Sequence, residues 1–264
     1  MKIATYNVWN ENKGIGGRFD QLSREINRVN ADIIGLQEVT TRFFQEVLEK
    51  TTDYPYRVYR KYETEDEGLA ILSRYPLEDC VFLHDHREYQ HSRALKVEFR
   101  VGRARFSLIN LHLPSESPKA QEDQLIAINN YLIREKDRWD YIIMLGDFNG
   151  GIHSSGHRYL TGEQTLKGHE SNPLWDELSS AYSVLNDLPL RATLDCVNNP
   201  RWKGKNTFYL PSVMDRIYIM DNWVHKTLKS VEIFGTEVSP ENQLAPSDHY
   251  GVVAEVAFEK GGSF

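Results

Sequence analysis

The chain has 264 residues, of which 40% are hydrophobic and 26% are charged, and its net charge is −7. This length can bury a sizeable core, and we expect residues 1–264 to form a single α/β domain. The composition excludes a disordered or fibrous chain. The negative charge argues against tight, non-specific binding to nucleic acid, because polyanions are repelled on average.

No apolar run approaches the about 18 residues that cross a membrane as a helix. The chain opens on MKIATYNVWN, which is not an apolar leader, so we expect a cytoplasmic protein. We also expect a monomer. Its two cysteines, Cys80 and Cys196, are too few for a disulfide framework or a zinc site. We expect both to be small buried hydrophobes.

Apolar strands alternate with amphipathic helices along the chain. Gly102 separates two alternating runs and so predicts a β-hairpin. The predicted elements, in chain order, are a strand at 2–9, a helix at 18–30, a strand at 31–39, a threonine-capped helix at 40–50, strands at 56–60, 68–74 and 81–85, hairpin strands at 94–100 and 104–113, a helix at about 117–138, a strand at 141–147, and strands near 206–210, 213–220, 229–234 and 250–258.

This mixture of hairpins and crossover helices favours two β-sheets packed face to face with helices outside, an α/β sandwich. Polar side chains gather where several of the strands end, and ligands bind at the carboxyl ends of strands in open α/β sheets. They are Asn7, Gln37, Glu38, Asn110, His112, Asp147, Asn149, Ser247, Asp248 and His249.

Each of these groups, taken alone, has a simpler explanation. Asp147-Phe148-Asn149 is typical of a turn, and Glu38 could be a favourable charge before a helix. A single histidine such as His112 is more often a structural side chain. Because the ends of several strands carry such groups, we favour a single site that they share.

Carboxylate and amide oxygens without thiols favour a hard cation, Mg²⁺ or Mn²⁺. Histidine and asparagine donors can stabilise charge on a phosphoryl group, so the set predicts metal-assisted hydrolysis of a phosphate ester. The segment RWKGK, with Arg201 and Lys203, is a candidate phosphate-binding patch, although a solvated loop explains it equally well.

Seven motifs in this order, TYNVW, LQEV, GLAILSRYP, INLHLPS, LGDFN, MDRIYI and PSDHYGV, resemble those of the endonuclease/exonuclease/phosphatase superfamily over residues 3–254. The resemblance implies a four-layer α/β sandwich with its site where the strand ends of the two sheets converge. It also implies a Mg²⁺-dependent hydrolase, in which water attacks phosphorus in line without a covalent enzyme intermediate.

The resemblance also assigns roles to individual residues. Glu38 is the principal metal ligand, supported by Asn7, which also meets the phosphate, and by Asp248. Asp147 positions or deprotonates the attacking water. Asn149 and His112 contact the phosphate. His249, oriented by Asp215, contacts the scissile phosphate. Whether Asp147 or His249 is the base stays open.

The substrate also stays open at this point. A nuclease or tyrosyl-DNA phosphodiesterase-like activity competes with a sphingomyelinase-like or phosphatase activity, and nucleic acid is one candidate partner. A catalytically silent module that binds phosphorylated ligands is the alternative from another class.

Two further segments attract attention. Residues 151–176 follow the LGDFN motif directly and are a candidate substrate-selecting loop, with Tyr159 and Trp175 as stacking candidates, although core packing suits Trp175 better. His84 and His86 could share a face of a strand as a second metal site, but an exposed loop explains them better.

Overall fold

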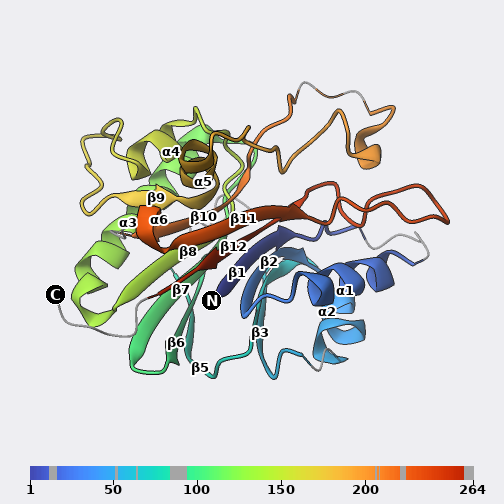
Figure 1. The fold of residues 1–264 in the computed structure, drawn as a ribbon, viewed down its shortest axis with the longest axis horizontal. Helices are drawn as coiled ribbons and strands as arrows, with labels where there is room; N and C mark the ends of the chain where they lie inside the picture. Colours follow the sequence, from blue (N-terminus) through green and yellow to red (C-terminus); the bar gives the residue numbers. More distant parts are fainter. Residues whose placement is uncertain are drawn as a thin grey trace.

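A computed structural model of the chain describes residues 1–11, 17–50, 53–63, 65–83, 94–205, 207, 209–220 and 224–258. Within these ranges two six-stranded sheets pack face to face, and helices lie outside them (Figure 1). The predicted four-layer α/β sandwich is therefore confirmed. No helix in the described ranges is long and apolar enough to cross a membrane.

Each sheet is mostly antiparallel and has one parallel pair at its centre, β1 with β2 and β7 with β8. The first sheet has the order β11 (Leu228–Phe234), β12 (Gly251–Val256), β1 (Lys2–Asn7), β2 (Ile33–Val39), β4 (Gly68–Ser73) and β3 (Tyr56–Lys61). The second has the order β5 (Leu77–Phe82), β6 (Ala94–Val101), β7 (Ala104–His112), β8 (Tyr141–Asp147), β10 (Asp215–Met220) and β9 (Trp175–Glu177).

The helices are short apart from α1 and α3. They are α1 (Arg18–Val29), α2 (Thr41–Glu46), α3 (Pro118–Glu135), α4 (Ser155–Leu160), α5 (Leu178–Asn186) and α6 (Val224–Thr227), with 3₁₀ turns at Leu48–Lys50, Lys136–Arg138 and Pro200–Trp202. The predicted threonine cap is present, because the side chain of Thr40 accepts a hydrogen bond from the backbone N–H of Phe43 at the start of α2.

Three apolar layers hold these elements together. The central layer lies between the sheets and contains, for example, Ile33, Leu145 and Ile217. Leu22 and Ile26 of α1 cover the outer face of the first sheet, as their helical spacing predicts. On the second sheet, α3 and α4 cover the outer face.

The structure corrects several local predictions. Cys80 and Cys196 are half-buried rather than buried. No strand forms at 206–210 in the part of that segment that the structure describes. Tyr159 and Trp175 are buried in the core beneath α3, where both bond to the Asn129 side chain, so neither is a stacking contact, and core packing was the right interpretation for Trp175. His84 and His86 lie outside the described residues.

Candidate active site

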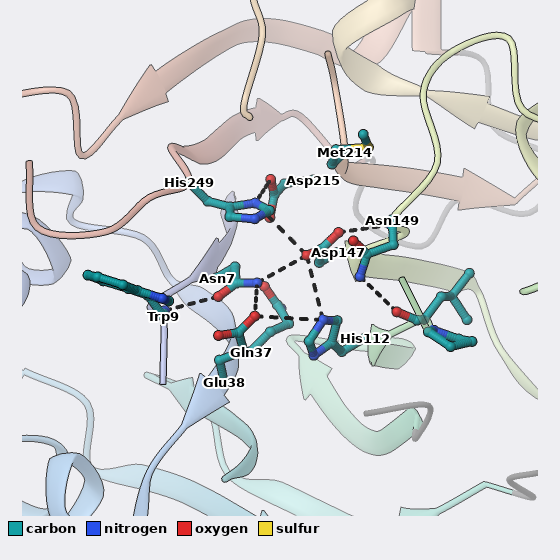
Figure 2. Close-up of polar contacts among 12 residues, drawn as sticks. Asn7, Trp9, Gln37, Glu38, His112, Asp147, Asn149, Met214, Asp215 and His249 are labelled. Carbon is teal, nitrogen blue, oxygen red and sulfur yellow. Dashed lines mark hydrogen bonds and ion pairs between the residues drawn. The ribbon is translucent and has the colours of Figure 1, made fainter. Parts of the chain in front are cut away.

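The topology brings the polar strand ends to one place. Asn7 and Glu38 are at the carboxyl ends of the parallel pair β1 and β2, and His112 and Asp147 end the parallel pair β7 and β8. Strand β10 runs antiparallel to β8 and begins at Asp215, directly opposite Asp147. His249 lies just before β12, which runs antiparallel to β1. Both sheets therefore contribute to the cluster that Figure 2 shows.

Asn7 holds two carboxylates of the cluster. Its Oδ1 accepts the backbone N–H of Trp9 at 3.0 Å, so the other end of the amide must be the donor. That Nδ2 donates to Oε1 of Glu38 at 2.9 Å and to Oδ2 of Asp147 at 3.0 Å (Figure 2). The second oxygen of Glu38, Oε2, accepts the backbone N–H of Asn10 at 2.9 Å. Asn7 thereby links the carboxylate of the first sheet to that of the second.

Asp147 is at the centre of the cluster and is fully buried. Its Oδ1 accepts the backbone N–H of Asn149 at 2.8 Å, and its Oδ2 lies 3.7 Å from Nε2 of His112. Strand β8 ends at Asp147, and Asn149 has a left-handed backbone with φ 47°. Its side chain donates to the carbonyl of Leu113 at 2.8 Å, so strand alternation does not orient Asn149.

His249 and Asp215 form a buried pair, with 2.9 Å between Nδ1 and Oδ2. Two hydroxyl residues position this pair: Ser247, which is among the polar residues at the strand ends, and Thr193, which the sequence did not indicate. Ser247 donates to the carbonyl of Asn7 and accepts the backbone N–H of His249, which ties the histidine segment to β1. Thr193 accepts the backbone N–H of Asp215 at 3.0 Å. The sequence places Ser247 at a strand end without assigning it a role, and nothing local marks Thr193.

The charges in the cluster shift each other's protonation. Burial alone raises the pKa of Asp147, but the charges of His249 and His112 and the bonds from Asn149 and Asn7 outweigh it and hold that pKa below its usual value. Burial and the charge of Asp147 raise the pKa of Asp215. Burial lowers the pKa of His249, yet the Asp215 and Asp147 carboxylates raise it well above the ordinary value. The cluster thus pairs an ionised carboxylate with an imidazolium.

Asp248 lies at the edge of the cluster. Burial raises its pKa to about 6, helped by the charge of Glu38 and opposed by His249 and Lys205. Its carbonyl accepts the indole N–H of Trp202 at 3.0 Å, but its carboxylate makes no side-chain hydrogen bond to the cluster within the described ranges. Asp248 is therefore close to the other predicted metal ligands, but no hydrogen bond within the described ranges ties its carboxylate to them.

The structure does not bring the predicted phosphate-binding patch into the cluster. Arg201 is 5% exposed, donates to the carbonyl of Ala245 and lies over the Trp9 ring, so it holds a loop instead of facing solvent. Lys203 is exposed and, in the described part of the chain, contacts no side chain of the cluster. Lys205 lies over both the Trp9 and the Trp202 rings, and its charge acts to lower the pKa of Asp248.

The residues fit a divalent cation. Glu38, Asp147 and Asp215 bring three carboxylates together without a thiol, and Oδ1 of Asp215 is buried without a hydrogen-bond partner. Ligand atoms of Asp147, Asp215 and His249 lie within 4.8 Å of one another, but Nδ1 of His249 already bonds Oδ2 of Asp215 at 2.9 Å. The Glu38 carboxylate, which is 17% exposed on its side chain, offers the better position.

Comparisons with known proteins agree with this geometry. The Endonuclease/Exonuclease/phosphatase family matches residues 4–249. Exodeoxyribonuclease III of Haemophilus influenzae is 25% identical over 158 residues, and the match spans 56% of this chain and 57% of that enzyme. Truncated TDP2 of Caenorhabditis elegans has the same fold, with a TM-score of 0.78 at 18% identity and 97% of each chain covered.

A second structure with the same fold is the mannosyl-6-phosphatase of Bacteroides thetaiotaomicron VPI-5482, with a TM-score of 0.72, 18% identity and coverage of 98% of this chain and 100% of that one. At such identity the structures establish the fold alone, whereas the family match covers most of the chain and includes every residue of the cluster. The chain therefore belongs to the Endonuclease/Exonuclease/phosphatase family, whose members hydrolyse phosphoester bonds.

Proposed function

We propose that the protein is a Mg²⁺-dependent phosphohydrolase that cleaves a phosphodiester, or a phosphomonoester, by in-line attack of water. One observation carries this proposal: the carboxylate of Asp147 is buried between two histidines and is held by Asn7 together with Glu38. An ionised acid beside imidazole donors suits an enzyme that handles a water molecule and an anionic phosphoryl group.

Glu38 would hold the metal ion, Mg²⁺ or Mn²⁺, with Asn7 fixing the orientation of its carboxylate and Asp248 completing the surrounding network. The bound ion supplies positive charge that neutralises the phosphate oxygens as charge builds up in the transition state. Because Asn7 donates hydrogen bonds to both Glu38 and Asp147, it fixes the position of the metal-binding carboxylate relative to the carboxylate that accepts a proton from water.

Asp147 accepts a proton from the attacking water, whose oxygen forms the new bond to phosphorus while the bond to the leaving alcohol breaks. His249 uses Nδ1 to bond Asp215, so its Nε2 is the nitrogen that can donate to a phosphate oxygen. Asn149 donates one amide hydrogen to Leu113 and has a second for the phosphate. His112 faces Glu38 and Asp147 and can protonate the leaving oxygen.

The substrate is proposed only as a phosphate ester. Support for a nucleic acid comes from the exodeoxyribonuclease III match and from D. rerio TDP2, whose structure holds a single-strand DNA product. Support for a small monoester comes from the mannosyl-6-phosphatase. A panel of DNA, 5′-tyrosyl DNA, sphingomyelin and phosphomonoesters would rank these classes. The monomeric state and the cytoplasmic location stay predictions.

The decisive experiment is hydrolysis of bis(p-nitrophenyl) phosphate by the purified protein with Mg²⁺, with Mn²⁺ and with EDTA, in the wild type and in Asp147→Asn. We expect turnover only with a metal ion, and a fall in kcat of about 10²- to 10⁴-fold in the variant, because general acid–base groups contribute that much. Asp137→Asn removes an exposed carboxylate and is the matched control. Turnover in EDTA, or full activity of Asp147→Asn, would contradict the mechanism.

A further inference from the structure

Asn149, beside Asp147 in the polar cluster, is bound at its carbonyl by a side chain from outside that cluster (Figure 2). Gln121, in the first turn of α3, donates through Nε2 to the carbonyl of Asn149 at 2.9 Å and to the carbonyl of Pro114 at 2.7 Å. Both amide hydrogens of Gln121 are therefore used, one on each of the two segments that follow β7 and β8. A helix on the outer face of the second sheet thereby contacts the backbone of a site residue.

The start of α3 fixes where Gln121 lies. The hydroxyl of Ser117 accepts the backbone N–H of Ala120 at 3.2 Å, and its carbonyl accepts the backbone N–H of Gln121 at 3.0 Å. Pro118 is the first helical residue, a position where its fixed φ suits the helix and its missing N–H has no cost. The backbone thus holds Gln121 in the helix, and the side-chain amide is left to bind the two carbonyls.

The bonds around Asn149 connect the ends of β7 and β8. The backbone N–H of Leu113 donates to the carbonyl of Asp147 at 2.9 Å, which continues the pairing of the two strands by one residue. The side chain of Asn149 donates to the carbonyl of Leu113 at 2.8 Å. Gln121 adds a third connection, between Pro114 and Asn149. Different partners therefore fix the side chain of Asn149 and the peptide that follows it.

The orientation of the peptide between Asn149 and Gly150 depends on Gln121. Asn149 has a φ of 47°, a left-handed conformation that persists in a non-glycine residue only where the surroundings fix it. Its N–H is bound by Asp147, and the next carbonyl, of Gly150, is bound by Arg216. Within the described residues, the carbonyl between these two points is bound by Gln121 alone. Loss of this bond would let the peptide rotate and move the side chain of Asn149.

We propose that Gln121 is a positioning residue of the active site, which acts on the phosphate ester only through Asn149. The inference rests on the proposed function, in which the second amide hydrogen of Asn149 donates to a phosphate oxygen. By fixing the peptide after Asn149, Gln121 directs that hydrogen toward the phosphate before the substrate binds. A donor contributes most to the rate when it is already held where charge develops, so Gln121 acts on kcat rather than on KM.

A double-mutant cycle between Gln121 and Asn149 tests this inference, with hydrolysis of bis(p-nitrophenyl) phosphate in Mg²⁺ as the measurement. Gln121→Met keeps the length and the helix propensity of the side chain but removes both donors. We expect kcat to fall about tenfold in Gln121→Met, with KM within about twofold of the wild type, and to fall about 10²-fold or more in Asn149→Ala. In the Asn149→Ala protein, adding Gln121→Met should not lower kcat further.

Gln124→Met is the matched control. Gln124 lies in the same helix, and neither polar atom of its buried side chain has a hydrogen-bond partner among the described residues, so kcat should equal that of the wild type. Gln121→Lys tests rescue, because its ammonium can donate to both carbonyls and should keep kcat within about threefold of the wild type. Gln121→Ala, which also removes both donors, takes the place of Gln121→Met in the cycle if the methionine variant does not fold.

Circular dichroism would show that each variant is folded under the assay conditions. Four results would overturn the role of Gln121 alone: wild-type kcat in Gln121→Met, an equal fall in Gln124→Met, an equal fall in Gln121→Lys, or a fall that persists undiminished in the Asn149→Ala protein. If the wild type does not hydrolyse the ester with Mg²⁺, the proposed function fails and this inference fails with it.

Discussion

Three non-glycine residues of the site have a left-handed backbone, Trp9, Glu38 and Asn149, with φ of 60°, 56° and 47°. Such conformations are unfavourable for L-residues and persist only where the surroundings fix them. Here the bonds that fix them end on site residues: Trp9 donates to Asn7, Asn7 donates to Glu38, and Asn149 donates to Asp147. The backbone strain and the polar cluster therefore support each other.

The charge on His249 gives a prediction at this scale. In the metal-free protein the pKa of His249 is well above its ordinary value, chiefly because the Asp215 and Asp147 carboxylates outweigh the effect of burial. Asp215→Asn removes the larger of these two effects, so the imidazole should lose its proton at a lower pH than in the wild type. Histidine-selective NMR titration in EDTA measures this directly. Asp137→Asn should leave the titration unchanged, and equal titrations in wild type and Asp215→Asn would contradict the assignment.

At the scale of elements, Gly146 allows β7 and β8 to pair closely just before Asp147. Its φ is 140°, and a Cβ there would lie 1.9 Å from the carbonyl oxygen of Leu111. Gly102, in the hairpin turn, also has a positive φ of 62°, but nothing lies within 4 Å of a Cβ at that position. Substitutions at the two glycines therefore distinguish the effect of backbone strain from the effect of steric clash on stability.

We therefore expect Gly146→Ala to lower the free energy of unfolding by about 3 kcal/mol or more, since clash adds to strain. Gly102→Ala should lower it by only about 1 kcal/mol, from the left-handed backbone alone. Urea denaturation followed by circular dichroism measures both values. Equal losses in the two variants would show that the close approach of the strands is unimportant.

The elements that could be predicted from the sequence are those with a local signal. The strands ending at Asn7, Val39 and Asp147 follow from apolar runs, and the hairpin follows from Gly102, so most of both sheets was predicted correctly. Helix α4 and the segment around Thr193 were not predicted. A six-residue helix shows no periodicity, and Thr193 is fixed by bonds to Ser212 and Asp215 that are distant in sequence.

The same reasoning explains which site residues could be predicted. Asp147, Glu38 and His249 each end or precede a strand, so strand topology alone brings them together. The prediction for Arg201 and Lys203 rests on charge, but charge does not show whether a side chain faces solvent, as Lys203 does, or is buried against the Trp9 ring, as Arg201 is. For Arg201, burial rather than charge decides where the side chain lies.

At the scale of the whole molecule, a buried polar bridge joins the two sheets beneath the site. Gln37 of the first sheet donates to Asn110 of the second at 2.6 Å. Asn110 donates in turn to the carbonyls of Leu36 and Ala70, both at 3.0 Å, where the β2–β4 register shifts. Because Glu38 lies within this irregularity of β2, a side chain from one sheet sets the backbone that carries the proposed metal ligand of the other.

Asn110→Leu should therefore impair both the fold and the site. Losing these bonds leaves buried groups on Gln37, Leu36 and Ala70 without their partner, which we expect to lower the free energy of unfolding by about 3 kcal/mol. Asn129→Leu is the matched control, because Asn129 is also fully buried and bonds to Tyr159 and Trp175, but in the layer beneath α3. Both variants should lose stability in urea, whereas kcat for bis(p-nitrophenyl) phosphate, measured where both are folded, should fall only in Asn110→Leu. An equal fall in kcat in both variants would mean that the bridge stabilises the fold without positioning Glu38.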